Sequence, residues 1–164
     1  MDPGPRRGGS TLSTGDGLVV RRAGPDDAAG VADVYLASFA ATYDFPLVHT
    51  DDQVRGWVRD VLVARGETWV AAEGGRIVGM LTVEDGGIDQ LYVAPDRLGE
   101  GIGRRLLDLA KERQPAGLSL YTFQANDRAR RFYERNGFAA EWFGDGGANE
   151  EGQPDVRYVW RPAR

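Results

Sequence analysis

Three glycines, Gly99, Gly101 and Gly103, alternate with other residues between an expected strand and an expected helix. Glycine lets the backbone approach a ligand closely, and a helix N-terminus presents N–H groups that have no partner within the helix. Together these features make a site for an anion such as a phosphate. The spacing is neither that of a Walker loop, which needs Lys followed by Ser or Thr, nor the G-x-G-x-x-G of a dinucleotide site. The pattern therefore predicts an anion site of another type.

Two arginines occupy the first turn of the same expected helix. Arg104 and Arg105 lie where the helix dipole is positive, so each opposes the dipole by about a few tenths of a kcal/mol. A bound polyanion would reverse that penalty, and a broken local rule of this kind is typical of a functional site. The alternative interpretation is an ordinary glycine turn with arginines that face solvent.

The composition excludes several other kinds of chemistry. The 164 residues include no cysteine and one histidine, His49, which removes disulfides, thiolate nucleophiles, iron–sulfur clusters and sites with several histidine ligands. Without a G-x-S-x-G motif, direct transfer between two bound substrates is favoured over covalent catalysis. The net charge of −5 argues against a nucleic-acid partner. No apolar run reaches the roughly 20 residues of a membrane span, so we expect a cytoplasmic protein with no membrane partner.

Hydrophobic patterning predicts the elements that position the glycines. Residues 1–17 are rich in Gly and lack aromatics, which predicts a flexible tail before a single domain at 18–164. Strands are expected at 18–21, 68–72, 76–83, 88–93, 118–123, 138–143 and 156–160, and helices at 25–39, 51–65, 102–113 and 126–136. Their order predicts a mixed sheet with helices on its faces, of the α/β or α+β class. The strands before and after the third helix should be parallel neighbours.

Two motifs resemble those of one enzyme family. The segment 93–103 is similar to a strand that ends in V-x-P, followed by Q/R-x-x-G-x-G/A. It departs from that pattern at Leu98, which stands at the Gln or Arg position, with Arg97 one place earlier. The segment 126–138 matches N-x-x-A-x-x-F-Y-x-x-x-G-F. With both motifs in this order, the chain resembles the GNAT superfamily of acetyl-CoA-dependent N-acyltransferases over residues 18–162.

The resemblance implies a GNAT fold, with about four helices and a mostly antiparallel sheet of about seven strands that splays between its fourth and fifth strands. It implies that acetyl-CoA lies in this gap, with the pantetheine arm on the fourth strand and the pyrophosphate on the glycines. The N–H of Leu91 would then polarise the thioester carbonyl. The cofactor-binding residues that it implies are Leu91, Tyr92, Val93, Leu98, Gly99, Glu100, Gly101, Ile102, Gly103, Arg104, Asn126, Arg130 and Tyr133.

The resemblance also assigns Tyr133 as the general acid of acetyl transfer to an amine within a ternary complex. A phenol with a pKa of about 10 stays protonated at neutral pH, and a departing thiolate, with a pKa of about 8.5 in a simple thiol, needs a proton. The alternative is a core tyrosine, since Ala129, Phe132 and Tyr133 form a packing stripe at helical spacing.

The general base has three candidates on or beside the fourth strand. Asp89 shares a strand face with Leu91 and is the first candidate, acting directly or through water. Glu84 and Asp85 are the alternatives. The competing interpretation of Asp89 is an exposed strand carboxylate.

We expect the acceptor site at the loop 42–49, the ends of the splayed strands and the loop before the last strand, which contains 149–151. The expected substrate-binding residues are Tyr43, His49, Gln90 and Gln124. Carboxylates and aromatics there favour a cationic primary amine of a small molecule or peptide, such as a polyamine, an amino acid or an aminosugar. The protein is expected to be a monomer or homodimer. The competing hypothesis is a non-catalytic acyl-CoA-binding sensor or scaffold, which has no need of a general acid.

Overall fold

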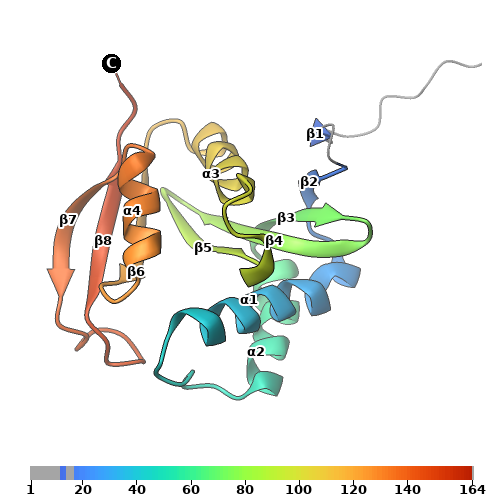
Figure 1. Cartoon of the computed structure of the whole chain (residues 1–164), viewed down its shortest axis with the longest axis horizontal. Coiled ribbons are helices and arrows are strands. Elements are labelled where there is room, and N and C mark those ends of the chain that lie inside the picture. Colours follow the sequence, from blue (N-terminus) through green and yellow to red (C-terminus); the bar gives the residue numbers. More distant parts are fainter. Residues whose placement is uncertain (1–11, 14–16, 164) are drawn as a thin grey trace, which may run out of the picture.

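A single sheet runs through the protein (Figure 1), whose computed structural model describes residues 12–13 and 17–163. The strand order is β1-β2-β3-β4-β5-β6-β8-β7. The strands are β1 (Leu12–Ser13), β2 (Val19–Arg22), β3 (Glu67–Glu73), β4 (Arg76–Glu84), β5 (Gly87–Val93), β6 (Leu118–Phe123), β7 (Ala139–Gly144) and β8 (Asp155–Trp160). Neighbouring strands are antiparallel except β5 and β6, which are parallel. The predicted mixed sheet and its parallel pair are confirmed.

Four α-helices in the described residues pack on this sheet. They are α1 (Ala28–Thr42), α2 (Asp51–Trp57), α3 (Ile102–Arg113) and α4 (Asp127–Arg135). A 3-10 turn at Pro25–Asp27 precedes α1, and another at Pro95–Arg97 precedes the glycines. The prediction of one regular helix over 51–65 is wrong in its second half, because residues Val58–Val63 form a π-helical segment that keeps Val58 and Leu62 buried.

The helices cover both faces of the sheet because its central strands alternate apolar side chains between them. Val70 and Met80 belong to a buried cluster with α1, α2 and the π-helical segment. Their chain neighbours Ala71 and Leu81 belong to a second cluster with α3 and with Tyr133 of α4. Two apolar layers therefore enclose β3 and β4, which form the rigid centre of the fold.

The expected flexible tail at 1–17 falls mainly on residues 1–11 and 14–16, which lie outside the described residues. Leu12–Ser13 forms β1 and pairs with residues 19–20 of β2. Because β1 precedes the seven expected strands, the fourth and fifth of those are β5 and β6. No helix in the described ranges is long and apolar enough to cross a membrane.

The sheet splays between β5 and β6, as predicted. These strands share one residue pair, Gly87 with Ser119, and then separate. A bulge accompanies the separation, because the register of β5 on β4 shifts from Thr82 opposite Gln90 to Val83 opposite Ile88 and leaves Asp89 as the extra residue. Bulges bend a strand and re-aim its side chains. The fold thus opens a gap at the C-terminal half of β5.

Polar contacts fix α1 beside this gap. Arg21 of β2 binds the carboxylate of Asp27 through two hydrogen bonds of 2.7 and 2.9 Å, and the Gly24 N–H donates to the same carboxylate at 2.8 Å. Further along α1, the buried Ser38 hydroxyl donates to the Val93 carbonyl of β5 at 2.8 Å. The helix is therefore held at its start by a charged pair and near its end by the edge of the gap.

Replacing Asp27 by Asn tests the anchor of α1. The hydrogen bonds from Arg21 hold the pKa of Asp27 below its usual value, so the stabilisation is present above the unfolded pKa of about 4 and is lost as the pH falls through the lower folded value. We expect Asp27→Asn to lower the free energy of unfolding by about 1–2 kcal/mol at pH 7, with the difference from wild type shrinking as the pH falls below about 4. Urea unfolding at several pH values measures this.

Asp33→Asn serves as the control, because Asp33 pairs with Arg55 and its side chain is 65% exposed. We expect its stability to match wild type at every pH. An Asp27→Asn deficit that stayed constant down to pH 3 would contradict the charged-pair explanation.

Candidate active site

The glycine loop, residues 98–103, joins β5 to α3 and leaves N–H groups free for a ligand. Gly99 and Gly101 have φ angles of 80° and 83°, in the left-handed region that favours glycine. No side chain caps α3, and the first backbone bond at this end runs from Arg105 N–H to the Gly101 carbonyl at 3.1 Å. The N–H groups in the first turn therefore lack intrahelical acceptors. This arrangement fits the predicted anion site.

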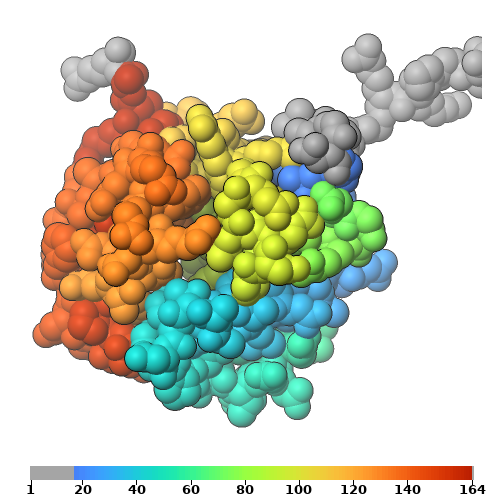
Figure 2. Space-filling model, viewed as in Figure 1, coloured from blue at the N-terminus to red at the C-terminus, as the bar shows by residue number. Residues whose placement is uncertain are grey.

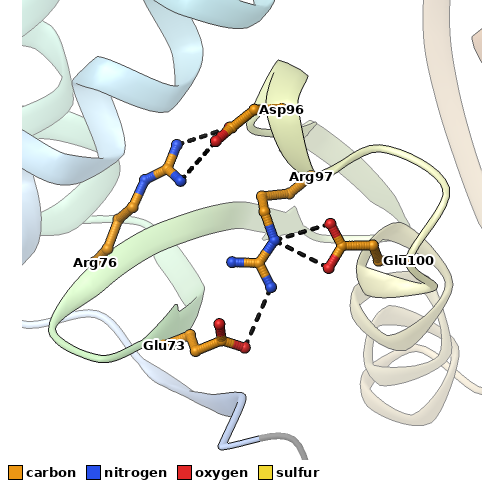
Figure 3. A network of polar contacts seen from close by, with 5 residues as sticks. All are labelled: Glu73, Arg76, Asp96, Arg97 and Glu100. Carbon is orange, nitrogen blue, oxygen red and sulfur yellow. Dashed lines mark hydrogen bonds and ion pairs between the residues drawn. The ribbon is translucent and has the colours of Figure 1, made fainter.

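Ion pairs anchor the segment that leads into the glycine loop (Figure 3). Arg97 donates to Glu100 at 2.9 Å and to Glu73 of β3 at 3.2 Å. Arg76 of β4 binds Asp96 through two hydrogen bonds of 2.9 and 2.8 Å. These pairs hold the loop against the β3–β4 hairpin. The charges of Arg97 and Glu100 neutralise each other.

A cleft of about 880 Å³, the cofactor cleft, lies between the glycine loop, β5 and α4. Figure 2 shows it as a recess between α4, in orange, and the glycine loop, in yellow-green, beside α1 in cyan. Its lining residues include Ser38, Thr42, Leu91, Tyr92, Val93, Arg97, Leu98, Gly99, Gly101, Ile102, Gly103, Arg104, Asn126, Arg128, Phe132, Tyr133 and Arg135. Four of these are arginines, so the cleft suits a polyanion.

Two helices meet closely at the floor of the cofactor cleft. A Cβ atom added to Gly103 of α3 would lie 3.4 Å from Cζ of Phe132 on α4 and 3.6 Å from Cγ2 of Val93. A Cβ atom at Gly99 would lie 4.0 Å from Nη2 of Arg128, so this guanidinium reaches the glycine loop. The absence of side chains here leaves the backbone N–H groups and Arg128 open to the same ligand.

The unpaired edge of β5 faces this cleft. Ala94 donates its N–H to Val78 of β4 at 2.8 Å, and successive N–H groups of a strand point to opposite edges. The N–H groups of Leu91 and Val93 therefore point away from β4, toward the gap where β6 has separated. Such an edge can bind an extended ligand through its backbone.

Tyr133 projects from α4 to the place where the cofactor cleft meets a second cleft. The side chain is 7% exposed and packs against the rings of Phe132, Phe138 and Tyr158. Burial raises the pKa of Tyr133 well above the usual value of a phenol. Its hydroxyl makes no hydrogen bond to any described residue, so a buried proton donor faces the junction of the clefts.

The second cleft, the acceptor cleft, has a volume of about 280 Å³ and lies between the splayed strands. It shares Leu91, Tyr92, Asn126 and Tyr133 with the cofactor cleft. Its other lining residues include Tyr35, Phe39, Tyr43, Asp89, Gln90, Tyr121, Thr122, Phe123, Asn149, Glu151 and Asp155. Aromatic rings and carboxylates thus line it, without a Lys, Arg or His among the described residues that do so.

Asn126 connects the two clefts to α4. Its side-chain oxygen accepts from the Ala129 N–H at 3.0 Å, which caps the helix as predicted. Its amide nitrogen donates to the Tyr43 hydroxyl at 3.0 Å. The ring of Tyr43 also contacts Phe39, Phe45 and Phe123. The loop after α1 is therefore held against the helix that carries Tyr133.

The three candidate bases lie at or beside the bulge in β5, and they differ in whether they line a cleft. Asp89 lines the acceptor cleft, and partial desolvation raises its pKa above the usual value of a carboxyl. Desolvation, followed by the charge of Asp89, also raises the pKa of Glu84. All three carboxylates are exposed, as the competing interpretation of Asp89 expects, but Glu84 and Asp85 line neither cleft. Of the three carboxylates, Asp89 is the one that lines a cleft together with Tyr133.

Besides Glu84 and Asp85, four further residues that the sequence suggested do not line the clefts. Glu100 is bound by Arg97, and Arg130 donates to the Tyr158 hydroxyl at 3.1 Å, because it lies on another side of α4. His49 pairs with Glu150 at 2.9 Å on the exposed surface. Gln124 donates to the carbonyls of Gly144 and Asp155, so it joins the end of β6 to the end of β7 and the start of β8. The remaining predicted residues lie on one or both clefts.

Sequence reasoning missed several lining residues on α4 and α1. Arg128, Phe132 and Arg135 follow one another at i, i+4 and i+7, so the helical period puts them on one face. That spacing was a signal that could have identified two further arginines of the cofactor cleft. Tyr35 and Phe39 of α1 repeat the same i, i+4 spacing on the acceptor side. No group of three acidic, His or Cys side chains in the described residues is arranged to hold a metal ion.

Comparison with known proteins places this architecture in a family. The family model described as an acetyltransferase (GNAT) domain matches residues 64–140. The chain is 30% identical over 132 residues to an uncharacterized N-acetyltransferase of Archaeoglobus fulgidus. This alignment covers 71% of this chain and 89% of that protein. It is 34% identical over 82 residues to the peptidyl-lysine N-acetyltransferase YiaC of Escherichia coli, spanning 49% of this chain and little more than half, 56%, of YiaC.

Solved structures share the fold. The solution structure of apo YjaB from Escherichia coli has a TM-score of 0.74 at 23% identity, covering 89% of this chain and 99% of that one. PaiA N-acetyltransferase from Thermoplasma acidophilum, in complex with coenzyme A, has a TM-score of 0.65 at 18% identity, covering 88% and 99%. With the glycine loop, the splayed strands and the archaeal relative in agreement, the chain belongs to the GNAT acetyltransferase family.

Proposed function

We propose that this protein is an N-acetyltransferase that moves the acetyl group of acetyl-CoA directly to a primary amine, with Tyr133 as the general acid. The observation that carries the proposal is Tyr133, whose side chain is buried and lines both clefts, and whose hydroxyl has no partner among the described residues. One cleft is lined by arginines and the other by carboxylates and aromatic rings. A sensor or scaffold that only binds acyl-CoA has no need of the second cleft or of the phenol.

The residues of the cofactor cleft fit acetyl-CoA. The uncapped N-terminus of α3 supplies N–H groups for a pyrophosphate, and Arg104 and Arg128 supply positive charge beside them. The free edge of β5 provides backbone groups for an extended arm. The PaiA neighbour is described as a complex with coenzyme A, which supports the same ligand here. Bound acetyl-CoA supplies an acyl group that is activated by a thiolate leaving group.

The chain's own groups then supply three functions. The Leu91 N–H, which points toward the gap, donates to the acyl carbonyl oxygen and stabilises the negative charge that develops on it. The Tyr133 hydroxyl donates its proton to the sulfur as the carbon–sulfur bond breaks. Asp89 accepts the proton of the attacking amine, directly or through water. The relatives YiaC and YjaB are named peptidyl-lysine N-acetyltransferases, which supports a lysine amine among the acceptors.

Replacing Gly101 by Ala tests the glycine loop. At a φ of 83° an alanine costs about 1–2 kcal/mol, and relaxing this strain turns the N–H groups away from the phosphates. We therefore expect a lower free energy of unfolding by that amount and a roughly tenfold weaker Kd for acetyl-CoA, measured by calorimetry. Wild-type protein that bound no acetyl-CoA at millimolar concentration would refute the cofactor assignment itself.

Gly56→Ala is the matched control for this change. Gly56 lies within α2 without a positive φ, and a Cβ atom there would meet no heavy atom closer than Arg59 Nη2 at 3.8 Å. Alanine favours a helix over glycine by about 1 kcal/mol. We expect unchanged acetyl-CoA binding and equal or higher stability.

Replacing Tyr133 by Phe tests the general acid. The change removes a hydroxyl that makes no hydrogen bond to the described residues, so the fold and the acetyl-CoA affinity should be preserved. We expect kcat to fall by about 10²- to 10⁴-fold, the usual contribution of a general acid, in an assay of CoA release with a panel of primary amines.

Tyr158→Phe is the control for Tyr133→Phe. Tyr158 is also buried, but its hydroxyl bonds to Arg130 and Glu134 and lies in neither cleft. We expect it to lose stability while keeping kcat within about threefold of wild type. Equal turnover by Tyr133→Phe and wild type would show that the acid assignment is wrong.

A further inference from the structure

We propose that the acceptor cleft selects an alkylamine with a second positive charge beside the reacting amine, and that Glu151 is the carboxylate that recognises this second charge. The inference rests on the proposed function, because it concerns the acceptor of the same reaction. It adds a substrate class and a residue that determines specificity.

The two clefts that meet at Tyr133 carry opposite charges. Arg97, Arg104, Arg128 and Arg135 line the cofactor cleft, whereas Asp89, Glu151 and Asp155 line the acceptor cleft. The loops around the acceptor cleft continue the pattern, since residues 43–52 and 144–155 contain seven carboxylates and no Lys or Arg. The one histidine of these loops, His49, is already paired with Glu150. The acceptor side therefore has negative charge that the protein does not neutralise.

Glu151 stands out among these carboxylates. It is half-buried and lines the acceptor cleft, yet it makes no hydrogen bond or ion pair with any described residue. Its charge acts on the tyrosines of that cleft. Burial, followed by the charge of Glu151, raises the pKa of Tyr35 to about 12, and Glu151 also contributes to the raised pKa of Tyr43. A carboxylate that is partly desolvated and unpaired favours a cation as its partner.

The reacting nitrogen cannot be that cation throughout the reaction. An amine attacks a carbonyl through its lone pair, so it must lose its proton, which Asp89 accepts at the junction with Tyr133. A charge that stays on the substrate must therefore come from a second group. The aromatic rings of Tyr43 and Phe123 contact each other and line the same cleft, and they suit an aliphatic stem or an ammonium group. This chemistry is found in a lysine beside another basic residue of a peptide, and in a polyamine.

The test compares matched acceptors on three proteins. One pair is a lysine peptide with a neighbouring arginine and the same peptide with the neutral isostere citrulline. The other pair is putrescine, a four-carbon diamine, and butylamine, which has the same carbon chain and one amine. We expect wild type to favour the doubly charged member of at least one pair by about five- to tenfold in kcat/KM, through KM, and Glu151→Gln to lose that preference. The pair that responds identifies the peptide or the polyamine as the source.

Glu150→Gln is the matched control, because it removes the same charge from the same loop, at a side chain that is 65% exposed and does not line the cleft. It should keep the preference within about twofold. Equal use of both members of each pair by wild type, or an equal loss of preference in the two variants, would overturn the assignment of Glu151.

A binding measurement separates this inference from the proposed function. Calorimetric titration of the four acceptors into each protein, with CoA present, reports charge recognition without any transfer. If the doubly charged acceptors bind more tightly to wild type than to Glu151→Gln but are not acetylated, the proposed function fails and the inference holds. If acetylation proceeds and neither KM nor Kd depends on the second charge, the inference alone fails.

Discussion

The site depends on one interruption of backbone hydrogen bonding, the separation of β5 from β6 after the pair Gly87–Ser119. Backbone N–H and carbonyl groups need partners, and a central strand normally finds them on both sides. Beyond that pair, β5 forms backbone hydrogen bonds with β4 alone. On its other edge, the Val93 carbonyl accepts a hydrogen bond from the Ser38 hydroxyl. The remaining groups form an edge inside the molecule. Two well-packed apolar layers around β3 and β4 keep the rest of the sheet intact, so the opening stays local.

The same opening brings opposite charges to one point. The arginines of the cofactor cleft come from α4, the start of α3 and the 3-10 turn before the glycine loop, whereas the carboxylates of the acceptor cleft come from β5, the β7–β8 loop and the start of β8. Tyr133 lies between them and is buried by aromatic neighbours. Burial disfavours the phenolate, so the position that separates the charges also holds a neutral proton donor. Helix α4 therefore shapes the junction of the clefts and also carries the phenol that stays protonated there.

The sequence could predict the parts of the site that depend on neighbours along the chain. Gly101 before a helix and Asn126 at a cap are local patterns, and the order of helices and strands along the chain follows from hydrophobic periodicity. The contacts of Gln124 and Arg130 were harder to predict, because their partners lie on β7 and β8, at sequence separations that no local pattern encodes. Arg128 was predictable in part. The helical period could show which face of α4 it occupies, but it could not show that its guanidinium reaches Gly99 of the glycine loop. The π-helical segment and the bulge in β5 likewise reflect tertiary packing.

The departure at Leu98 has a physical counterpart in the ion pairs before the glycine loop. Leu98 is 44% exposed and offers no hydrogen bond to a phosphate, and the adjacent Arg97 is held by Glu73 and Glu100. Exposed ion pairs each contribute little to stability. Arg97, however, is 20% exposed and spans two carboxylates on different elements, so it restricts the direction in which the loop leaves β5. A loop whose N–H groups are already oriented loses less entropy when it binds a ligand. Orientation by Arg97 thus serves the anion site that we propose without a direct contact from its guanidinium, since in that proposal Arg104 and Arg128 supply the positive charge beside the phosphates.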